Sequence, residues 1–199
     1  MKKYVKFIIG VFALIVLIGV SSLVYKNLIK GYGVDKELNI SSKAQADGTE
    51  MAEDEKETEK TSMIDFTVTN ATDEETTLSS FTGKPIILNF WASWCGPCKS
   101  EMPDFQSAYE KYGTEVEFVM VNLTDGVRET KEGASAFIEN QGYTFPTYYD
   151  VDQSAAYAYY VNSIPTTYFI DKDGYIVASS QGTLDAETLE NGIDLIVND

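Results

Sequence analysis

Two cysteines separated by two residues are the side chains of this chain best suited to chemistry, and they lie in the stretch Trp94-Cys95-Gly96-Pro97-Cys98. At the start of a predicted helix, this spacing brings two sulfurs close enough to form and break a disulfide bond. Unpaired backbone N–H groups and the positive end of the helix dipole would stabilise a thiolate at the first position. We therefore predict that Cys95 is a nucleophile that attacks a disulfide of a partner. Cys98, one turn further and more buried, would then resolve the mixed disulfide.

Two other interpretations of the cysteine pair fit the composition less well. Half of a zinc site would need further Cys or His ligands, but the chain has 2 cysteines in all and no histidine. A purely structural disulfide would close so short a loop that it would constrain the unfolded chain little. We therefore expect a redox-active dithiol with no metal and no other cofactor.

The composition excludes several other kinds of function. Without histidine the chain cannot build His-ligated zinc or haem sites, Ser-His-Asp triads or Cys-His nucleophiles. It carries 15 Lys and Arg residues against 31 Asp and Glu residues, for a formal net charge of −16. A surface of that sign repels phosphate, so we do not expect nucleic-acid binding.

Residues 1–30 form the first of three segments, and we predict that they anchor the chain in a membrane. Three lysines precede the uncharged run Phe7–Tyr25. As a helix this run would span about 28 Å, close to the hydrocarbon thickness of a bilayer. No A-x-A cleavage site follows it, so an uncleaved anchor is favoured over a cleaved signal peptide. Lysines lie on both sides of the run, but one N-terminal span before a single domain favours an extracytoplasmic domain.

Residues 31–61 form the second segment, which we interpret as a flexible acidic linker. They lack hydrophobic periodicity, and Ala44–Lys60 is charged, polar and free of aromatic residues. A solvated spacer explains this composition more simply than a segment that recognises a partner.

Residues 62–199 form the third segment, a folded α/β domain. Apolar runs and alternating patterns predict the strands, and a Cys-containing stretch with apolar residues at helical spacing predicts the helix that begins with the cysteines. An Asp173-Gly174 pair predicts a hairpin turn near the end of the chain. The expected strands are Ile64–Val68, Pro85–Trp91, Glu115–Leu123, Phe145–Tyr149, Thr166–Ile170 and Tyr175–Ser179. The expected helices are Cys95–Tyr112, Glu129–Gln141, Gln153–Tyr160 and Leu184–Val197. This order implies a mixed sheet with helices on both faces.

The stretch Ile87–Lys99, ILNFWASWCGPCK, resembles the thioredoxin superfamily. With the predicted anchor, the chain is similar to the TlpA/ResA branch of membrane-anchored, extracytoplasmic thiol-disulfide oxidoreductases. The resemblance implies a thioredoxin-like fold with a central mixed β-sheet flanked by helices, preceded by an N-terminal extension. The stretch Asn122–Pro165 is longer than a plain thioredoxin needs, which matches the helix–strand insertion of that branch.

The resemblance also assigns roles to individual residues. Ile164-Pro165 matches the family's cis-proline loop, whose backbone lies beside the sulfurs and can pair with a substrate chain. Glu101 matches an acidic residue near the cysteines, which could move a proton to or from a thiol; the alternative is a first-turn carboxylate that complements the helix dipole. Asn89 stands where cytoplasmic thioredoxins carry a buried Asp, which leaves Glu101 as the ionisable group of the site.

We expect the substrate to contact residues close to the nucleophile, namely Trp94, Gly96, Pro97, Ile164 and Pro165. Trp91 is expected to pack nearby instead. The tyrosine-rich stretch Tyr143–Tyr160 could line a substrate groove, but half-buried packing explains it more simply.

The leading functional hypothesis is an enzyme, a protein disulfide reductase that uses the Cys95–Cys98 pair. The resemblance implies a membrane electron donor of the CcdA/DsbD type, and clients such as apocytochrome c or an extracellular methionine sulfoxide reductase. A disulfide-forming oxidase is one alternative, although such enzymes often place a histidine between the cysteines. A copper-binding or chaperone module on the same fold is another, for which Met102 is the nearby candidate ligand.

Overall fold

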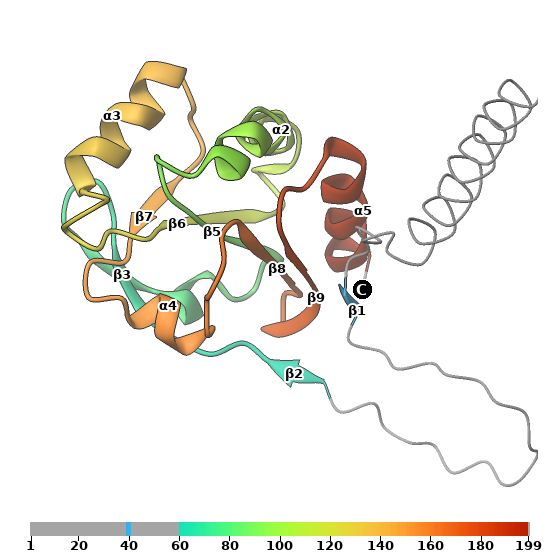
Figure 1. Cartoon of the computed structure of the whole chain (residues 1–199). Helices are drawn as coiled ribbons and strands as arrows, with labels where there is room; N and C mark the ends of the chain where they lie inside the picture. The colour runs from blue at the N-terminus through green and yellow to red at the C-terminus, as the bar shows by residue number, and fades with distance from the viewer. Residues whose placement is uncertain (1–38, 41–59, 199) are drawn as a thin grey trace, which may run out of the picture. The chain divides into compact units, whose positions relative to one another are not determined.

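The computed structural model describes residues 39–40 and 60–198 (Figure 1). The predicted membrane anchor, residues 1–30, lies outside the described residues. Within the described part, no helix combines the length and the apolar character needed to cross a membrane. Most of the predicted linker, residues 31–61, is also outside this part. Two short pieces of that segment are described: Asn39–Ile40, which forms a β-strand, and residues 60–61, of which the second begins the strand Thr61–Ser62.

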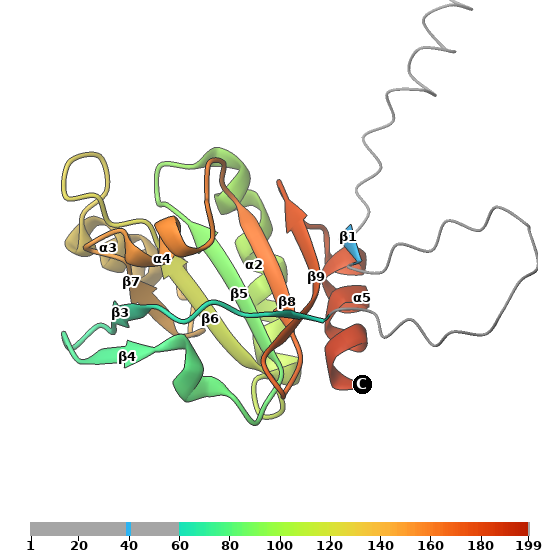
Figure 2. The same cartoon turned by 90° about the horizontal axis from the view of Figure 1, so that it is seen from below.

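The described residues build one mixed sheet in the order β1-β9-β8-β5-β6-β7-β3-β4, with β2 also paired to β9. The strands are β1 (Asn39–Ile40), β2 (Thr61–Ser62), β3 (Thr67–Thr69), β4 (Glu75–Thr77), β5 (Ile86–Trp91), β6 (Glu117–Asn122), β7 (Thr147–Tyr149), β8 (Thr166–Ile170) and β9 (Tyr175–Gln181). Strands β5, β6 and β7 run parallel to one another, and β8 runs antiparallel to both of its neighbours, β5 and β9. Figure 2 shows β3 and β4 at one edge and β9 toward the other.

Strand β5 is the central strand that leads into the cysteine motif. All six of its residues are buried, because it pairs with β6 on one side and β8 on the other while helices cover both faces. The nearly continuous apolar sequence of β5 is typical of such a doubly covered strand. The predicted strand Pro85–Trp91 is therefore confirmed to within one residue.

Helices cover both faces of the sheet, as the sequence predicts. They are η1 (Leu78–Phe81), α2 (Gly96–Tyr112), α3 (Lys131–Gln141), α4 (Ser154–Ala158) and α5 (Ala186–Val197). One core contains residues of α2, α3 and α5, and the other contains residues of η1 and α4. In Figure 1, α2 and α3 lie above the sheet and α4 lies below it.

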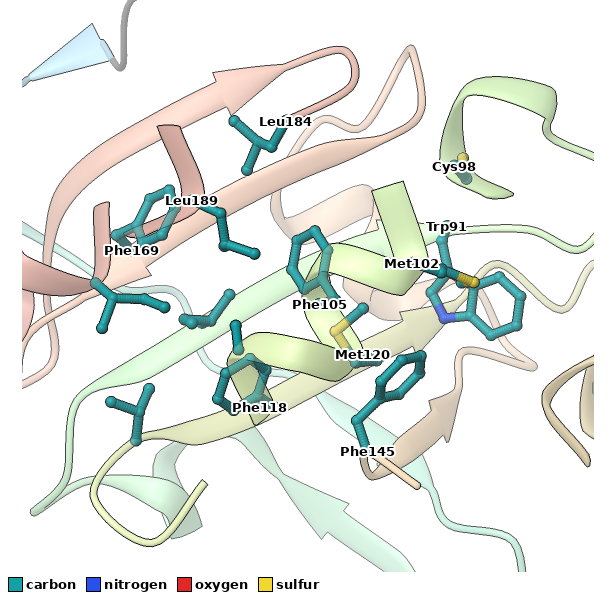
Figure 3. Packing of buried hydrophobic residues seen from close by; sticks show 14 of the residues in the cluster. Trp91, Cys98, Met102, Phe105, Phe118, Met120, Phe145, Phe169, Leu184 and Leu189 are labelled. Carbon is teal, nitrogen blue, oxygen red and sulfur yellow. The ribbon is translucent and has the colours of Figure 1, made fainter. Parts of the chain in front are cut away.

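The core beneath α2 reaches directly to the cysteines. Met102 and Phe105 of α2 pack with Phe118 and Met120 of β6, and Cys98 belongs to the same cluster (Figure 3). These side chains are at most 1% exposed. The start of α2 is therefore fixed by a closely packed interior, which holds the motif in one position.

The N-terminal part of the domain differs most from the sequence-based expectation. The predicted strand Ile64–Val68 is wrong in its bounds, because β3 covers Thr67–Thr69 and Ile64 is 49% exposed. β3 forms a hairpin with the polar strand β4, which carries no apolar alternation to reveal it. The Asn70 side-chain oxygen closes this hairpin by accepting hydrogen bonds from the backbone N–H groups of Thr72 and Glu74.

Candidate active site

The two cysteines lie where β5 ends and α2 begins. Cys95 is the N-cap of α2, and its Sγ accepts a hydrogen bond from the backbone N–H of Cys98 at 3.2 Å. Pro97 occupies the first turn, where its missing N–H leaves no donor unpaired. The cysteines are joined by a disulfide. Cys95 is 4% exposed and Cys98 is fully buried, which confirms the predicted difference in burial.

The environment of Cys95 suits a thiolate. A sulfur at the helix N-cap lies at the positive end of the helix dipole, and the backbone N–H of Cys98 donates directly to it. Cys98 is instead the third residue of α2, and it lies among apolar core residues that disfavour a charge. This difference supports attack by Cys95 on an external disulfide and a later attack by Cys98 on the resulting mixed disulfide.

The loop before β8 passes next to the nucleophile. The Ile164–Pro165 peptide bond is cis, as predicted from the resemblance. The carbonyl oxygen of Ile164 lies 3.7 Å from the Sγ of Cys95, and Pro165 is followed at once by β8. An extended polypeptide that paired with the Ile164 backbone would therefore run beside this sulfur.

Glu101 is buried on α2, one turn after Cys98. It is 1% exposed, and its carboxylate accepts hydrogen bonds from the backbone N–H of Leu184 at 2.9 Å and from the Asn89 side-chain amide at 3.0 Å. Burial raises the pKa of Glu101 to about 7; the two hydrogen bonds oppose this rise, and the nearby Asp104 adds to it. A carboxyl group with such a pKa can accept or release a proton near neutral pH.

Asn89 lies on β5 beneath this region and cannot ionise. Its side-chain amide also donates to the Thr167 hydroxyl on β8 at 2.9 Å, so it links the active-site helix to the central sheet. Its Oδ1 atom has no hydrogen-bond partner among the described residues. Because the Asn89 amide does not titrate, Glu101 is the ionisable group of this hydrogen-bonded pair.

A second buried carboxylate holds the loop that leads into the motif. Glu129 is 2% exposed and accepts hydrogen bonds from the backbone N–H of Ser93, the Ser93 hydroxyl and the Asn122 side-chain amide, at 2.7 to 2.8 Å. Ser93 lies two residues before Cys95. The sequence pattern does not reveal Glu129 as a site residue; it predicts a helix that begins at this glutamate, but α3 begins at Lys131.

The exposed surface of the site is formed by the residues beside Cys95. Trp94 is 40% exposed, Gly96 and Pro97 are exposed, and the guanidinium carbon of Arg128 lies 3.4 Å from the centre of the Trp94 ring. Trp91 is fully buried, in agreement with its predicted packing role. The predicted contact of Trp94, Gly96 and Pro97 with a substrate stays a prediction.

The tyrosine-rich stretch divides into three groups. Tyr143 and Tyr148 are half-buried and pack against the two cores, as the packing interpretation predicts. Tyr149 and Tyr159 are buried, which agrees with the packing interpretation. The ring of Tyr159 contacts the ring of Phe66 in an edge-to-face arrangement. Tyr157 and Tyr160 are 78% and 86% exposed, so packing does not account for them.

The sequence matches the AhpC/TSA family over residues 60–179. The chain belongs to the AhpC/TSA family. Within this family of thioredoxin-like proteins, one relative is the thiol-disulfide oxidoreductase ResA of Geobacillus kaustophilus. It is 37% identical over 146 residues, which cover 70% of this chain and 82% of the relative. The thioredoxin-like protein YneN of Bacillus subtilis is 35% identical over 132 residues, which cover 66% of this chain and 76% of that protein.

Solved structures place this AhpC/TSA-family chain in the same group. StoA from Bacillus subtilis superimposes with a TM-score of 0.58 at 30% identity, covering 65% of this chain and 96% of StoA. The exposed lipoprotein thioredoxin Etrx1 of Streptococcus pneumoniae gives a TM-score of 0.56 at 29% identity, covering 66% of this chain and 100% of that protein. The predicted thioredoxin-like fold and the resemblance to ResA are confirmed. The predicted enzyme class, thiol-disulfide oxidoreductase, is confirmed with them, because the family chain carries the cysteine pair which that chemistry requires.

Proposed function

We propose that this protein is a membrane-tethered, extracytoplasmic reductase of disulfides in client proteins. The observation that carries this proposal is the position of the Cys95–Cys98 pair: an N-capping sulfur at the surface end of α2, a buried sulfur behind it, and the Ile164 backbone alongside. The names of the relatives, thiol-disulfide oxidoreductase ResA among them, agree with this chemistry.

The reaction transfers two electrons from the protein dithiol to the client disulfide. The Cys95 thiolate attacks one sulfur of the client disulfide, and the other client sulfur leaves as a thiolate and takes up a proton. Cys98 loses its proton and attacks the Cys95 sulfur of the mixed disulfide, which releases the second client sulfur. The client then holds two thiols, and the protein holds the Cys95–Cys98 disulfide.

Glu101 serves this second step as the proton acceptor. Cys98 is surrounded by apolar side chains, so its thiol must lose a proton to a nearby base before it can attack. Glu101 follows it by three positions on the same helix face, with a pKa raised to about 7. The carboxylate form can therefore take up the proton near neutral pH and release it to solvent or to a leaving thiolate later.

The client backbone binds along the cis-proline loop. An extended client segment pairs with the backbone of Ile164 and places its disulfide against Cys95, while Trp94, Gly96 and Pro97 contact the side chains that flank it.

The location and the partners rest on sequence. The uncharged run Phe7–Tyr25 is long enough to span a bilayer, and residues 31–61 would tether the domain to it on the extracytoplasmic side. A reductase in that compartment must be recharged, because an oxidising environment does not supply thiols. We propose a membrane donor of the CcdA/DsbD type, and apocytochrome c or a methionine sulfoxide reductase as clients.

The reduction potential of the cysteine pair tests the direction of electron flow. The full-length protein in detergent is equilibrated with redox buffers, and the fraction of disulfide is measured by thiol labelling. We expect a potential on the order of −250 mV, because a Gly-Pro pair between the cysteines is found in strongly reducing thioredoxins. A value above about −150 mV would instead support the disulfide-forming oxidase.

A further inference from the structure

The positive charges of the described domain are distributed unevenly around the active site. Most of its lysines are engaged elsewhere: the pairs are Lys60–Asp171, Lys84–Glu117, Lys111–Glu190 and Lys131–Asp73, and Lys172 also has a partner. Within the described part of the chain, the two cations that take part in no such ion pair are Lys99 and Arg128. Both lie beside the cysteine motif: Lys99 follows Cys98, and Arg128 lies over Trp94.

Arg128, which is the single arginine of the chain, has an unusual position. Its guanidinium carbon is 3.4 Å from the centre of the Trp94 ring, and Trp94 precedes the nucleophile directly. A guanidinium stacked on an aromatic face keeps its N–H donors in the plane of the group, where a carboxylate can accept two of them at once. The side chain is exposed, so these donors can be reached from solvent.

The loop that carries Arg128 is fixed on both sides of this residue. The Asp125 carboxylate accepts hydrogen bonds from the backbone N–H groups of Val127, Arg128 and Glu129, at 2.7 to 2.9 Å. The Glu129 carboxylate in turn binds Ser93, next to Trp94. Arg128 is thus held over Trp94 by the backbone, not only by the ring contact. The three backbone N–H donors, together with the electrostatic attraction of the Arg128 guanidinium, lower the pKa of the Asp125 carboxyl. No ion pair with Arg128 is formed within the described residues, so the guanidinium N–H donors stay accessible.

We propose that Arg128 and Lys99 bind carboxylates that flank the reactive disulfide of the client, so that the preferred client segment is acidic. This inference rests on the proposed disulfide exchange at Cys95 and adds the charge of its substrate. An acidic segment faces long-range repulsion from a chain of net charge −16. At physiological salt, charges are screened beyond about 8 Å, so the two cations next to the sulfur dominate once the segment is docked.

Two synthetic peptides test this inference with the full-length protein in detergent. They share one intramolecular disulfide, and each carries either three Asp or three Asn residues on both sides of it. The protein is first reduced, and the rate constant for reduction of each peptide is measured at neutral pH and about 0.15 M salt, where the repulsion from the distant negative charges is screened. We expect the Asp peptide to react about five times faster than the Asn peptide, the product of a factor of about 2.5 from Arg128 and about two from Lys99, each smaller than the effect of one fully formed charge pair in water.

Four comparisons then assign the preference to these side chains. Arg128→Gln should lower the ratio of the two rates to about two, and Arg128→Gln combined with Lys99→Gln should lower it to about one. Lys84→Gln removes the same charge at the opposite end of β5 and should keep the ratio near five. Salt at about 0.5 M should abolish the preference in the unaltered protein. The ratio is the readout, because any effect of Arg128 on the Cys95 thiolate changes both rates equally.

The outcomes separate this inference from the function on which it rests. Reduction of both peptides at equal rates, or a ratio that Arg128→Gln and the double variant leave unchanged, would overturn the acidic preference and leave the reductase intact. Reduction of neither peptide would overturn the proposed function, and the preference with it.

Discussion

Two buried glutamates flank the cysteine motif, and they differ in how many donors hold them. On the helix side, Glu101 receives two hydrogen bonds, and its burial raises its pKa to about 7. On the loop side, Glu129 receives three, from two groups of Ser93 and from Asn122. Both side chains are nearly inaccessible to solvent.

The difference shows how the same residue type serves two purposes in one site. A carboxylate that accepts hydrogen bonds from two separate segments acts as a fixed link between them. A carboxylate with fewer donors in an apolar environment is close to neutral and can exchange a proton. We therefore assign Glu129 to the positioning of the loop before Cys95, and Glu101 to proton transfer.

The largest expected effect is on stability, through Glu129. In Glu129→Ala, the Asn122 amide and the two Ser93 groups lose their acceptor, so we expect the free energy of unfolding to fall by about 4 kcal/mol. Chemical denaturation of the oxidised protein measures it. Glu132→Ala, an exposed glutamate of the same segment, is the control and should change the value by less than about 0.5 kcal/mol. A loss of that small size in Glu129→Ala would show that Glu129 does not hold the loop.

The next effect is a pH dependence that belongs to Glu101. Its folded pKa of about 7 exceeds its unfolded value of 4.5, so the folded state binds more protons between these pH values. The stability contributed by this group is complete below the unfolded pKa and is lost as the pH rises through the folded one. From about pH 5 to pH 8, the unaltered protein should lose about 2.5 kcal/mol relative to Glu101→Gln.

Denaturation of both proteins at the two pH values measures this difference, because the other titrating groups contribute equally to each and cancel. A difference that stays constant between the two pH values would contradict the raised pKa, and with it the role of Glu101 as a proton acceptor. Glu101 and Glu129 would then no longer differ in the way that assigns proton transfer to one and positioning to the other.

Much of the fold could be predicted from local signals. The buried strands β5 and β6 appear in the sequence as apolar runs. The helix α2 is predicted by Cys95 and Pro97 at its start and by the apolar residues that follow at helical spacing. The cysteine pair, Glu101 and the cis bond before Pro165 were assigned from their own motif or from its resemblance to a family. These features depend on residues close together in sequence.

The features that could not be predicted depend on contacts between distant segments. The hairpin of β3 and β4 is closed by Asn70 and has a polar sequence, and the two short strands β1 and β2 are defined by their pairing with β9. The contacts of Glu129 with Ser93 and of Arg128 with Trp94 bring together residues more than thirty positions apart. One sequence signal points to these last two contacts. The pattern predicts β5 and β6 as buried strands of one sheet, and if the two strands are parallel, the residues that follow them meet at the same edge of the sheet.

The formation of a mixed disulfide tests the central claim, that Cys95 attacks and Cys98 resolves. Reduced full-length Cys98→Ala protein is mixed with insulin, whose disulfides serve as the client, and the adduct is quantified on a non-reducing gel after thiol blocking. We predict that Cys98→Ala accumulates a mixed disulfide through Cys95, and that the matched Cys95→Ala variant forms about ten times less of it. Equal amounts of adduct from the two variants, or no adduct from Cys98→Ala, would contradict the assignment of the nucleophile.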